Sequence, residues 1–208
     1  MRKIAIINQK GGCGKTTTAI NLAACLAEKD KTVLLIDLDP QAHSTIGLLK
    51  TNKDIDKTIF DVLCFPEKTS INETIMVLGE NFSFIPSNII LSATEQKLSG
   101  VFGREDRLKN SLAALNDSYQ YMLIDCPPSI GLLTFNALKA CTEAIVPIEP
   151  SIYSLHGLSQ LLETIDIIKN EQNHHISVEA LATMVNMRTH FCINIHLSLK
   201  YASYTFCF

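Results

Sequence analysis

Short apolar runs alternate with longer amphipathic segments along this 208-residue chain. The runs are continuous or nearly so, which is typical of strands buried on both faces of a parallel sheet. We predict strands in residues 4–7, 33–36, 81–87, 121–124, 143–148 and 178–185.

The segments between these runs carry apolar residues at helical spacing. We predict helices in residues 18–29, 58–63, 91–98, 104–115, 132–141 and 154–170. Ser154 is expected to be the N-cap of the last helix, because its hydroxyl can accept a bond from a free N–H. Residues 70–78 are expected to hold a further turn or helix.

The alternation of strands and helices predicts an α/β fold with a mostly parallel, twisted sheet and helices on both faces. A length of 208 residues suits one domain. No apolar run is long enough to span a membrane, and the start of the chain is a strand rather than a signal peptide. The net charge of -3 excludes a surface coated in positive charge but leaves room for a local basic patch that binds DNA.

Seven cysteines are scattered along the chain without a C-x-x-C pair. This spacing weighs against zinc or an iron–sulfur cluster held within one chain. We expect reduced thiols in the cytoplasm, most of them acting as small core residues. Cys13 is the exception because it lies in a glycine-rich loop, where it either fills space or is open to alkylation.

That glycine-rich loop follows the first strand and leads into the first helix, with the sequence NQKGGCGKTT at residues 8–17. Glycines let backbone N–H groups converge on a phosphate, and the helix N-terminus adds partial positive charge. Lys15 can reach the terminal phosphates, and the Thr16 hydroxyl can bind Mg²⁺. We predict that ATP is bound by Gly11, Gly12, Cys13, Gly14, Lys15, Thr16 and Thr17.

Carboxylates follow two of the predicted strands, at Asp37, Asp39 and Asp125. Each of them could be an ordinary helix cap or turn former. Beside a phosphate loop, Asp39 could orient the attacking water and Asp37 could support the Mg²⁺ shell. Asp125 fits the aspartate that steadies Mg²⁺, typically through a water.

Three motifs together carry a family resemblance. Gln9 stands where the usual phosphate loop has glycine, and Lys10 adds a second lysine. The sequences DLDPQ at residues 37–41 and DCPPS at residues 125–129 follow the carboxylate strands. In these features the chain resembles the ParA/MinD/nitrogenase-iron-protein ATPases, and it is most similar to the ParA/Soj branch.

The resemblance implies a P-loop NTPase-like fold and an ATPase that uses ATP and Mg²⁺. Lys10 would act with Lys15 and Asp39 in catalysis, reaching across a homodimer to the partner's nucleotide. Asn186 would contact adenine, with a turn former as the alternative. The implied function is partitioning of chromosome or plasmid DNA, with non-specific DNA binding and a ParB-like partner. The implied location is the cytoplasm, in association with the nucleoid.

Two alternatives stay open. The chain could be a related ATPase that positions or regulates a protein complex, or a nucleotide-binding remnant without productive dimerisation. A membrane-bound version would need a basic amphipathic C-terminal helix, which residues 191–208 do not supply.

The resemblance covers an expected domain of residues 1–190 and stops at an atypical tail, residues 191–208. The tail is rich in β-branched and aromatic residues and lacks glycine, proline and acidic residues. We expect a truncated or frameshifted end, and a genuine short variant is the alternative. Residues 203–208 are of a type that aggregates when exposed, so we expect a chain less stable and less soluble than a full-length relative.

Overall fold

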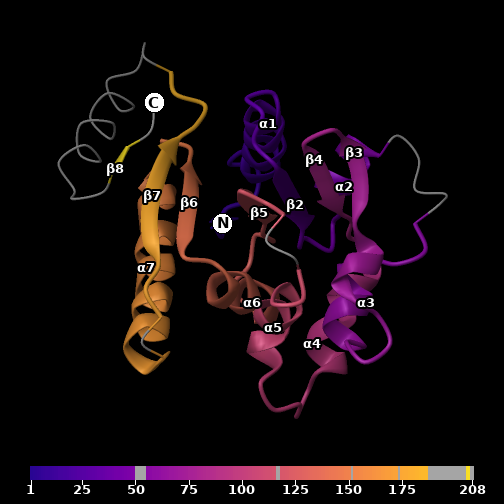
Figure 1. Ribbon diagram of the computed structural model, residues 1–208. Coiled ribbons are helices and arrows are strands. Elements are labelled where there is room, and N and C mark those ends of the chain that lie inside the picture. Colours follow the sequence, from indigo (N-terminus) through magenta and orange to yellow (C-terminus); the bar gives the residue numbers. More distant parts are fainter. Residues whose placement is uncertain (50–54, 116–117, 151, 173, 187–204, 207–208) are drawn as a thin grey trace.

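The structure of the protein is a computed structural model that describes residues 1–49, 55–115, 118–150, 152–172, 174–186 and 205–206. Within these residues one eight-stranded sheet has the order β3-β4-β2-β5-β1-β6-β7-β8. Neighbouring strands are parallel except for the antiparallel pair β3 and β4. Figure 1 shows this sheet with helices on either side.

The strands at the centre of the sheet are its most apolar segments. All five residues of β2 are buried, and four of the five in β5. Continuous burial explains why these strands lack the alternation of a half-exposed sheet. The eight strands are β1 (Arg2–Ile6), β2 (Val33–Asp37), β3 (Met76–Gly79), β4 (Phe82–Ile85), β5 (Tyr121–Asp125), β6 (Glu143–Ile148), β7 (Ser177–Ala182) and β8 (Thr205–Phe206).

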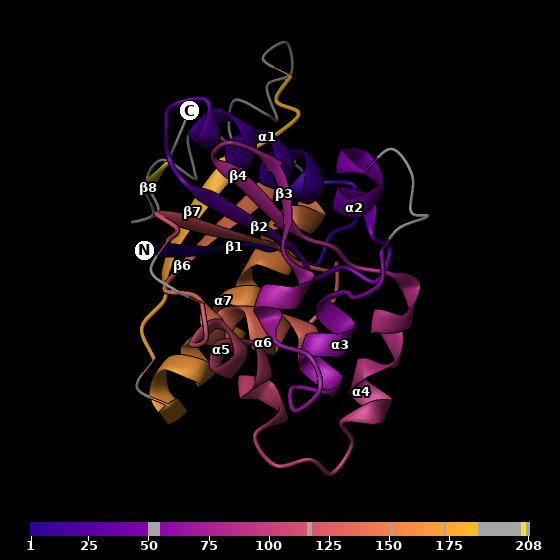
Figure 2. The same ribbon diagram turned by 45° about the vertical axis from the view of Figure 1, so that its right-hand side comes forward.

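Helices cover both faces of the sheet. Helices α1 (Lys15–Ala27) and α2 (His43–Leu48) lie on one side, and the remaining α-helices lie on the other (Figure 2). The latter are α3 (Ile59–Cys64), α4 (Thr94–Lys97), α5 (Arg107–Leu112), α6 (Leu132–Ala140) and α7 (Ile152–Gln172). Short 3₁₀ turns occupy Ile71–Thr74, Ile89–Ala93 and Arg104–Asp106.

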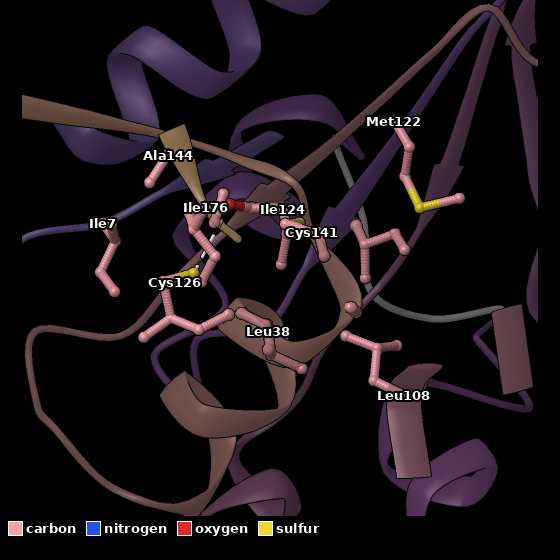
Figure 3. Close-up of a cluster of buried hydrophobic side chains, with 14 of the residues drawn as sticks. Ile7, Leu38, Leu108, Met122, Ile124, Cys126, Cys141, Ala144 and Ile176 are labelled. Atoms are coloured by element: carbon pink, nitrogen blue, oxygen red, sulfur yellow. Dashed lines mark hydrogen bonds between the residues drawn. The ribbon is translucent and has the colours of Figure 1, made fainter. Parts of the chain in front are cut away.

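Successive residues of each central strand contribute to two different hydrophobic cores, one on each face of the sheet, because side chains alternate across a strand. Val33 and Leu35 pack with Ala19 and Ala23 beneath α1. Leu34 and other residues of the opposite face join the larger core under α3 and α5 to α7. Figure 3 shows part of this larger core, with Met122, Ile124 and Cys126 spaced out along β5 and the residue that follows it.

A capping box sets the start of α3. The Thr58 side chain accepts a bond from the N–H of Phe60, and the Thr58 N–H donates to Asp61 Oδ2 at 2.8 Å. The two bonds satisfy backbone donors that the first turn would otherwise leave free. The predicted helix at 58–63 is confirmed.

The α/β fold with a mostly parallel sheet and helices on both faces is confirmed. Two details differ. Residues 70–78 hold a 3₁₀ turn followed by β3, whose antiparallel pairing with β4 no local pattern indicated. The helix predicted at 154–170 begins at Ile152, so Ser154 lies inside its first turn and is not its N-cap.

The segments predicted as helices at 91–98 and 104–115 hold only short helices. Between them Gly100 and Gly103 adopt positive φ angles of 74° and 68°, which end one helical turn before the next begins. Most of the tail at 191–208 lies outside the described residues; within it, Thr205–Phe206 pair with β7. No helix in the described ranges is long and apolar enough to cross a membrane.

The described cysteines form no disulfide. Cys13, Cys64, Cys126 and Cys141 are buried, in agreement with the predicted role as small core residues. Burial raises the pKa of the Cys126 and Cys141 thiols, so both stay protonated.

Candidate functional site

A pocket of about 440 Å³ opens at the carboxyl ends of the central strands. The glycine-rich loop forms one wall, and residues that follow β2, β5 and β7 form the other. Ligands of open α/β sheets bind in such a position, where connections leave to opposite sides. The lining consists of Gly11, Gly12, Gly14, Lys15, Thr16, Thr17, Asp39, Gln41, His43, Pro128 and Met184.

Two glycines of the loop have left-handed backbones. The φ angle is 72° at Gly12 and 91° at Gly14. A side chain in this region is strained, so glycine is required for the turn that aims the loop N–H groups at the pocket. Gly14 is also the N-cap of α1, and its carbonyl accepts the N–H of Thr18 at 2.8 Å.

The loop is held from behind by two residues that the sequence analysis missed. Asn8 is buried; its Nδ2 donates to the Pro147 carbonyl at 2.7 Å and its Oδ1 accepts the Lys10 N–H at 3.0 Å. Thr183 Oγ1 donates to the Cys13 carbonyl at 2.8 Å. Asn8 could have been found as the first polar residue after β1, whereas nothing local marks Thr183.

The two lysines of the loop point in different directions. Lys15 is 7% exposed, lines the pocket and donates from Nζ to the Lys10 carbonyl at 2.9 Å. The ammonium of Lys10 forms an ion pair with Glu149, which follows β6 in the same chain. The glycine-rich motif predicts a role for both lysines, whereas no local pattern indicates Glu149.

Asp37 and Asp125 lie directly opposite each other on the neighbouring strands β2 and β5. Both are fully buried. Asp37 Oδ2 accepts the Thr45 N–H at 2.8 Å and the Thr45 hydroxyl at 2.7 Å, while Oδ1 accepts the Asp39 N–H at 3.1 Å. Asp125 Oδ2 accepts the Ser44 hydroxyl at 2.7 Å. The structure therefore brings together the two carboxylates predicted to support a metal.

The surroundings of this pair weaken its acidity. Burial raises the pKa of Asp37 to about 7; the hydrogen bond from Thr45 opposes the rise, and the charge of Asp125 adds to it. Burial also raises the pKa of Asp125, against hydrogen bonds from Ser44 and Thr16. A cation placed beside both groups would restore their ionised form, because an opposite charge favours a carboxylate.

Asp39 occupies a different position from its neighbour. It is 6% exposed and lines the pocket, and its Oδ1 accepts the Gln41 N–H at 2.9 Å. The carboxylate is thereby fixed at the pocket wall, facing the loop that carries Lys15 and Thr16.

The hydroxyl of Thr16, which lines the pocket, and the neighbouring buried carboxylate of Asp125 suit a hard cation such as Mg²⁺, which prefers oxygen ligands. Asp125 Oδ1 is buried and has no hydrogen-bond partner among the described residues, and Thr16 lies within hydrogen-bonding reach of this carboxylate. Among the residues that the structure describes, no three or more Asp, Glu, His or Cys side chains are grouped to hold a metal alone. An ion here would therefore be shared with a ligand, as Mg²⁺ is with nucleotide phosphates.

Two predicted ligand residues lie away from the lining. Cys13 is fully buried beneath the loop. Asn186 is exposed beyond β7, and from that segment Met184 lines the pocket. The proposed contact between Asn186 and adenine stays a prediction.

A family model described as "AAA domain" matches residues 1–178. The sporulation initiation inhibitor protein Soj of Bacillus subtilis is 43% identical over 198 residues, which cover 95% of this chain and 78% of Soj. The chromosome partitioning protein ParA of Caulobacter vibrioides is 38% identical over 191 residues, covering 90% of this chain and 71% of that protein. The chain belongs to this AAA-domain family as a ParA/Soj-type ATPase.

Solved structures place the fold of this ParA-type chain among the P-loop NTPases. A cobyrinic acid a,c-diamide synthase from Mycobacterium smegmatis, with bound ATP analogue and magnesium, superposes with a TM-score of 0.89. It is 33% identical, and the match covers 97% of this chain and 82% of that one. A plasmid partition protein from Borrelia burgdorferi has a TM-score of 0.85 at 26% identity, covering 99% and 87%. The predicted family and fold are confirmed, and the individual roles of the site residues stay predictions.

Proposed function

We propose that this ParA-type chain is a Mg²⁺-dependent ATPase that dimerises on ATP, binds DNA non-specifically and partitions chromosome or plasmid DNA with a ParB-like partner. The observation that carries the proposal is the convergence of Lys15, Thr16 and Asp39 on one 440 Å³ pocket. Similarity to Soj and ParA along most of the chain supports the same reading.

In this proposal the loop N–H groups and Lys15 hold the phosphates of ATP, as in other phosphate loops. Thr16, Asp37 and Asp125 would hold Mg²⁺. The bound ion would neutralise charge on the phosphates during transfer. The adenine would lie toward the segment after β7, where Met184 lines the pocket and Asn186 follows.

Hydrolysis joins a water oxygen to the γ-phosphorus and breaks the bond from that phosphorus to the β–γ bridging oxygen. Asp39 would orient the water, since its fixed carboxylate faces the pocket. Lys15 would stabilise the charge that develops on the phosphate oxygens. The catalysis is therefore positioning combined with electrostatic stabilisation.

The second copy of the chain would complete the site. Within one chain, Lys10 turns to Glu149, while Lys15 lines the pocket. We assign Lys10 to the partner's nucleotide, so that the ATP-bound dimer is the active form.

DNA binding by such a dimer would use phosphate contacts and would weaken steeply with salt. A ParB-like partner would stimulate hydrolysis and release the dimer from DNA. The expected location is the cytoplasm, at the nucleoid.

A filter-binding experiment with unrelated DNA fragments tests this function. With ATP and Mg²⁺ we expect retention of every fragment at low salt, falling as salt rises, and little retention with ADP or without nucleotide. Retention that does not depend on ATP, or no retention at low salt, would contradict the proposal.

A second candidate is a biosynthetic role for the same ATPase site. The observation that favours it is the 33% identity to the cobyrinic acid a,c-diamide synthase. A further alternative keeps the same ATPase site but uses it to position a protein complex. Either role predicts ATP turnover without ATP-dependent DNA retention, so the filter-binding experiment separates them from partitioning.

A further inference from the structure

Two hydroxyls at the start of α2 are directed at the two buried carboxylates. Ser44 and Thr45 are both fully buried. Ser44 bonds to Asp125 and Thr45 bonds to Asp37, each at 2.7 Å. Hydroxyls in a helix commonly bond to a carbonyl of the preceding turn, so this direction toward another element is a specific feature.

The direction of the bonds at Thr45 follows from the chemistry of its partners. Thr45 Oγ1 lies 2.9 Å from the backbone N of Ser87, which can only donate. Oγ1 therefore accepts there, and its single hydrogen goes to Asp37 Oδ2 at 2.7 Å. One hydroxyl thus joins the end of β2 to the residues that follow β4.

These bonds close into a ring around Asp39. The Asp39 N–H donates to Asp37 at 3.1 Å, and the Asp39 carbonyl accepts the Ser87 hydroxyl at 2.8 Å. Asp37 and Ser87 are in turn joined through Thr45. Both backbone polar groups of Asp39 are therefore held by residues that Thr45 connects.

All members of this ring are almost inaccessible to water. The exposed fraction is 0% for Asp37 and Thr45, 2% for Ser87 and 6% for Asp39. Water cannot readily replace a bond lost in such a place, so removal of one hydroxyl leaves buried groups unsatisfied. Of the ring residues, Asp39 lines the pocket, whereas Asp37, Thr45 and Ser87 do not. These three residues therefore do not contact a nucleotide bound in the pocket.

We propose that Thr45 is a positioning residue that fixes Asp39 for catalysis by bridging Asp37 and Ser87. The proposal rests on the proposed function only for the role of Asp39; the ring itself is a property of the free protein. Loss of the bridge would let the Asp39 backbone shift within the pocket. A shift of about 1 Å in a catalytic group can reduce turnover about a hundredfold.

The test compares Thr45→Val, which keeps the shape and loses the hydroxyl, with Thr45→Ser, which keeps the hydroxyl. We expect Thr45→Val to lower kcat for ATP by about tenfold to a hundredfold while KM stays within about twofold. Thr45→Ser should keep kcat within about threefold of the unchanged protein. A folded Thr45→Val protein with unchanged kcat, or a Thr45→Ser protein as impaired as Thr45→Val, would overturn the proposal.

Ser87→Ala provides a second route if Thr45→Val does not fold. This change removes the hydroxyl bond to the Asp39 carbonyl and leaves the Ser87 N–H in place, so we expect a selective fall in kcat of about tenfold. Thr74→Val is the matched control, because Thr74 is also buried and, among the residues that the structure describes, its hydroxyl donates to the Ile71 carbonyl of its own turn and not to the ring. The control should lose stability without a change in kcat; a selective kcat loss in the control but not in Ser87→Ala would count against the ring.

Hydrogen exchange at the Asp39 amide tests the ring without any turnover. In Thr45→Val we expect exchange at least about tenfold faster than in the unchanged protein, with no acceleration in Thr74→Val. Unchanged protection of the Asp39 amide would overturn the proposal. An absence of ATP turnover in the unchanged protein would instead contradict the proposed function, and the exchange result would still decide the ring.

Discussion

Lys10 is paired with Glu149 of its own chain. The side chains are 35% and 39% exposed, so water screens the pair and it contributes little to folding. An ion pair of this kind is easy to open. If Lys10 acts on a partner's nucleotide, its ammonium must leave Glu149 each time the dimer forms and bind a phosphate instead.

Glu149→Gln removes the charge that competes for Lys10. We expect this variant to dimerise with ATP at a several-fold lower protein concentration than the unchanged chain, because an exposed pair is worth up to about 1 kcal/mol. Sedimentation at a series of protein concentrations measures the shift. Glu143→Gln is the matched control: Glu143 pairs with Arg2 at the opposite end of β6, and its loss should leave dimerisation unchanged. Weaker dimerisation of Glu149→Gln would show that Glu149 assists the dimer.

Asp39→Ala removes the carboxylate at the pocket wall and leaves the phosphate loop intact. We expect ATP binding to persist while turnover falls by about 10² to 10⁴, the usual loss for a group that handles the attacking water. Lys15→Ala is expected to behave differently and lose ATP binding itself. Equilibrium binding of a fluorescent ATP analogue together with single-turnover hydrolysis measures both. Normal hydrolysis by Asp39→Ala would refute the role given to this residue.

The pH dependence of stability in metal-free protein reports on Asp37. Its pKa rises from the ordinary value of 3.8 to about 7 on folding, so between these values the folded state holds a proton that the unfolded state has lost. The contribution of Asp37 is therefore most favourable at acid pH and is lost as pH rises toward about 7. Each pH unit between the two pKa values lowers the free energy of unfolding by about 1.4 kcal/mol.

Asp37→Asn isolates this contribution, since the amide does not titrate. We expect urea unfolding in the presence of a chelator to show that the free energy of unfolding of the variant rises relative to that of the unchanged protein between about pH 4 and pH 7. A stability difference that stays constant over this range would contradict the raised pKa.

Ala42 precedes α2 with a φ angle of 53°, in the left-handed region. A residue with a Cβ pays roughly 1–2 kcal/mol there, and glycine does not. We expect Ala42→Gly to stabilise the protein by about 1 kcal/mol, measured by urea unfolding. Ala24→Gly is the matched control, because Ala24 lies within α1, where glycine should cost about 0.5–1 kcal/mol. Destabilisation in both variants would argue against strain at Ala42.

The sequence predicts most of the site because its parts depend on local order. A continuous apolar run predicts a buried strand, and the carboxyl ends of parallel strands meet at one edge of a sheet. This is why Asp37, Asp39 and Asp125 could be placed near the phosphate loop without coordinates. The composition of a glycine-rich loop predicts its geometry, so Lys15 and Thr16 could also be identified from the sequence.

The supporting contacts depend on the order of strands, which no local pattern shows. Ser87 reaches Asp39 across 48 positions of sequence because β4 lies beside β2. Glu149 meets Lys10 across 139 positions because β6 lies beside β1. The antiparallel strand β3 was missed for a related reason, since it is short and lies at the sheet edge, where burial is incomplete.

The dependence of ATP turnover on protein concentration tests most directly whether a second copy completes the site. If a second copy completes the site, turnover per chain rises with concentration in the presence of Mg²⁺ and approaches a plateau as dimers form. Lys10→Ala should bind ATP normally and show no such rise. Turnover per chain that is constant across concentrations, with Lys10→Ala as active as the unchanged protein, would contradict a site shared between two chains.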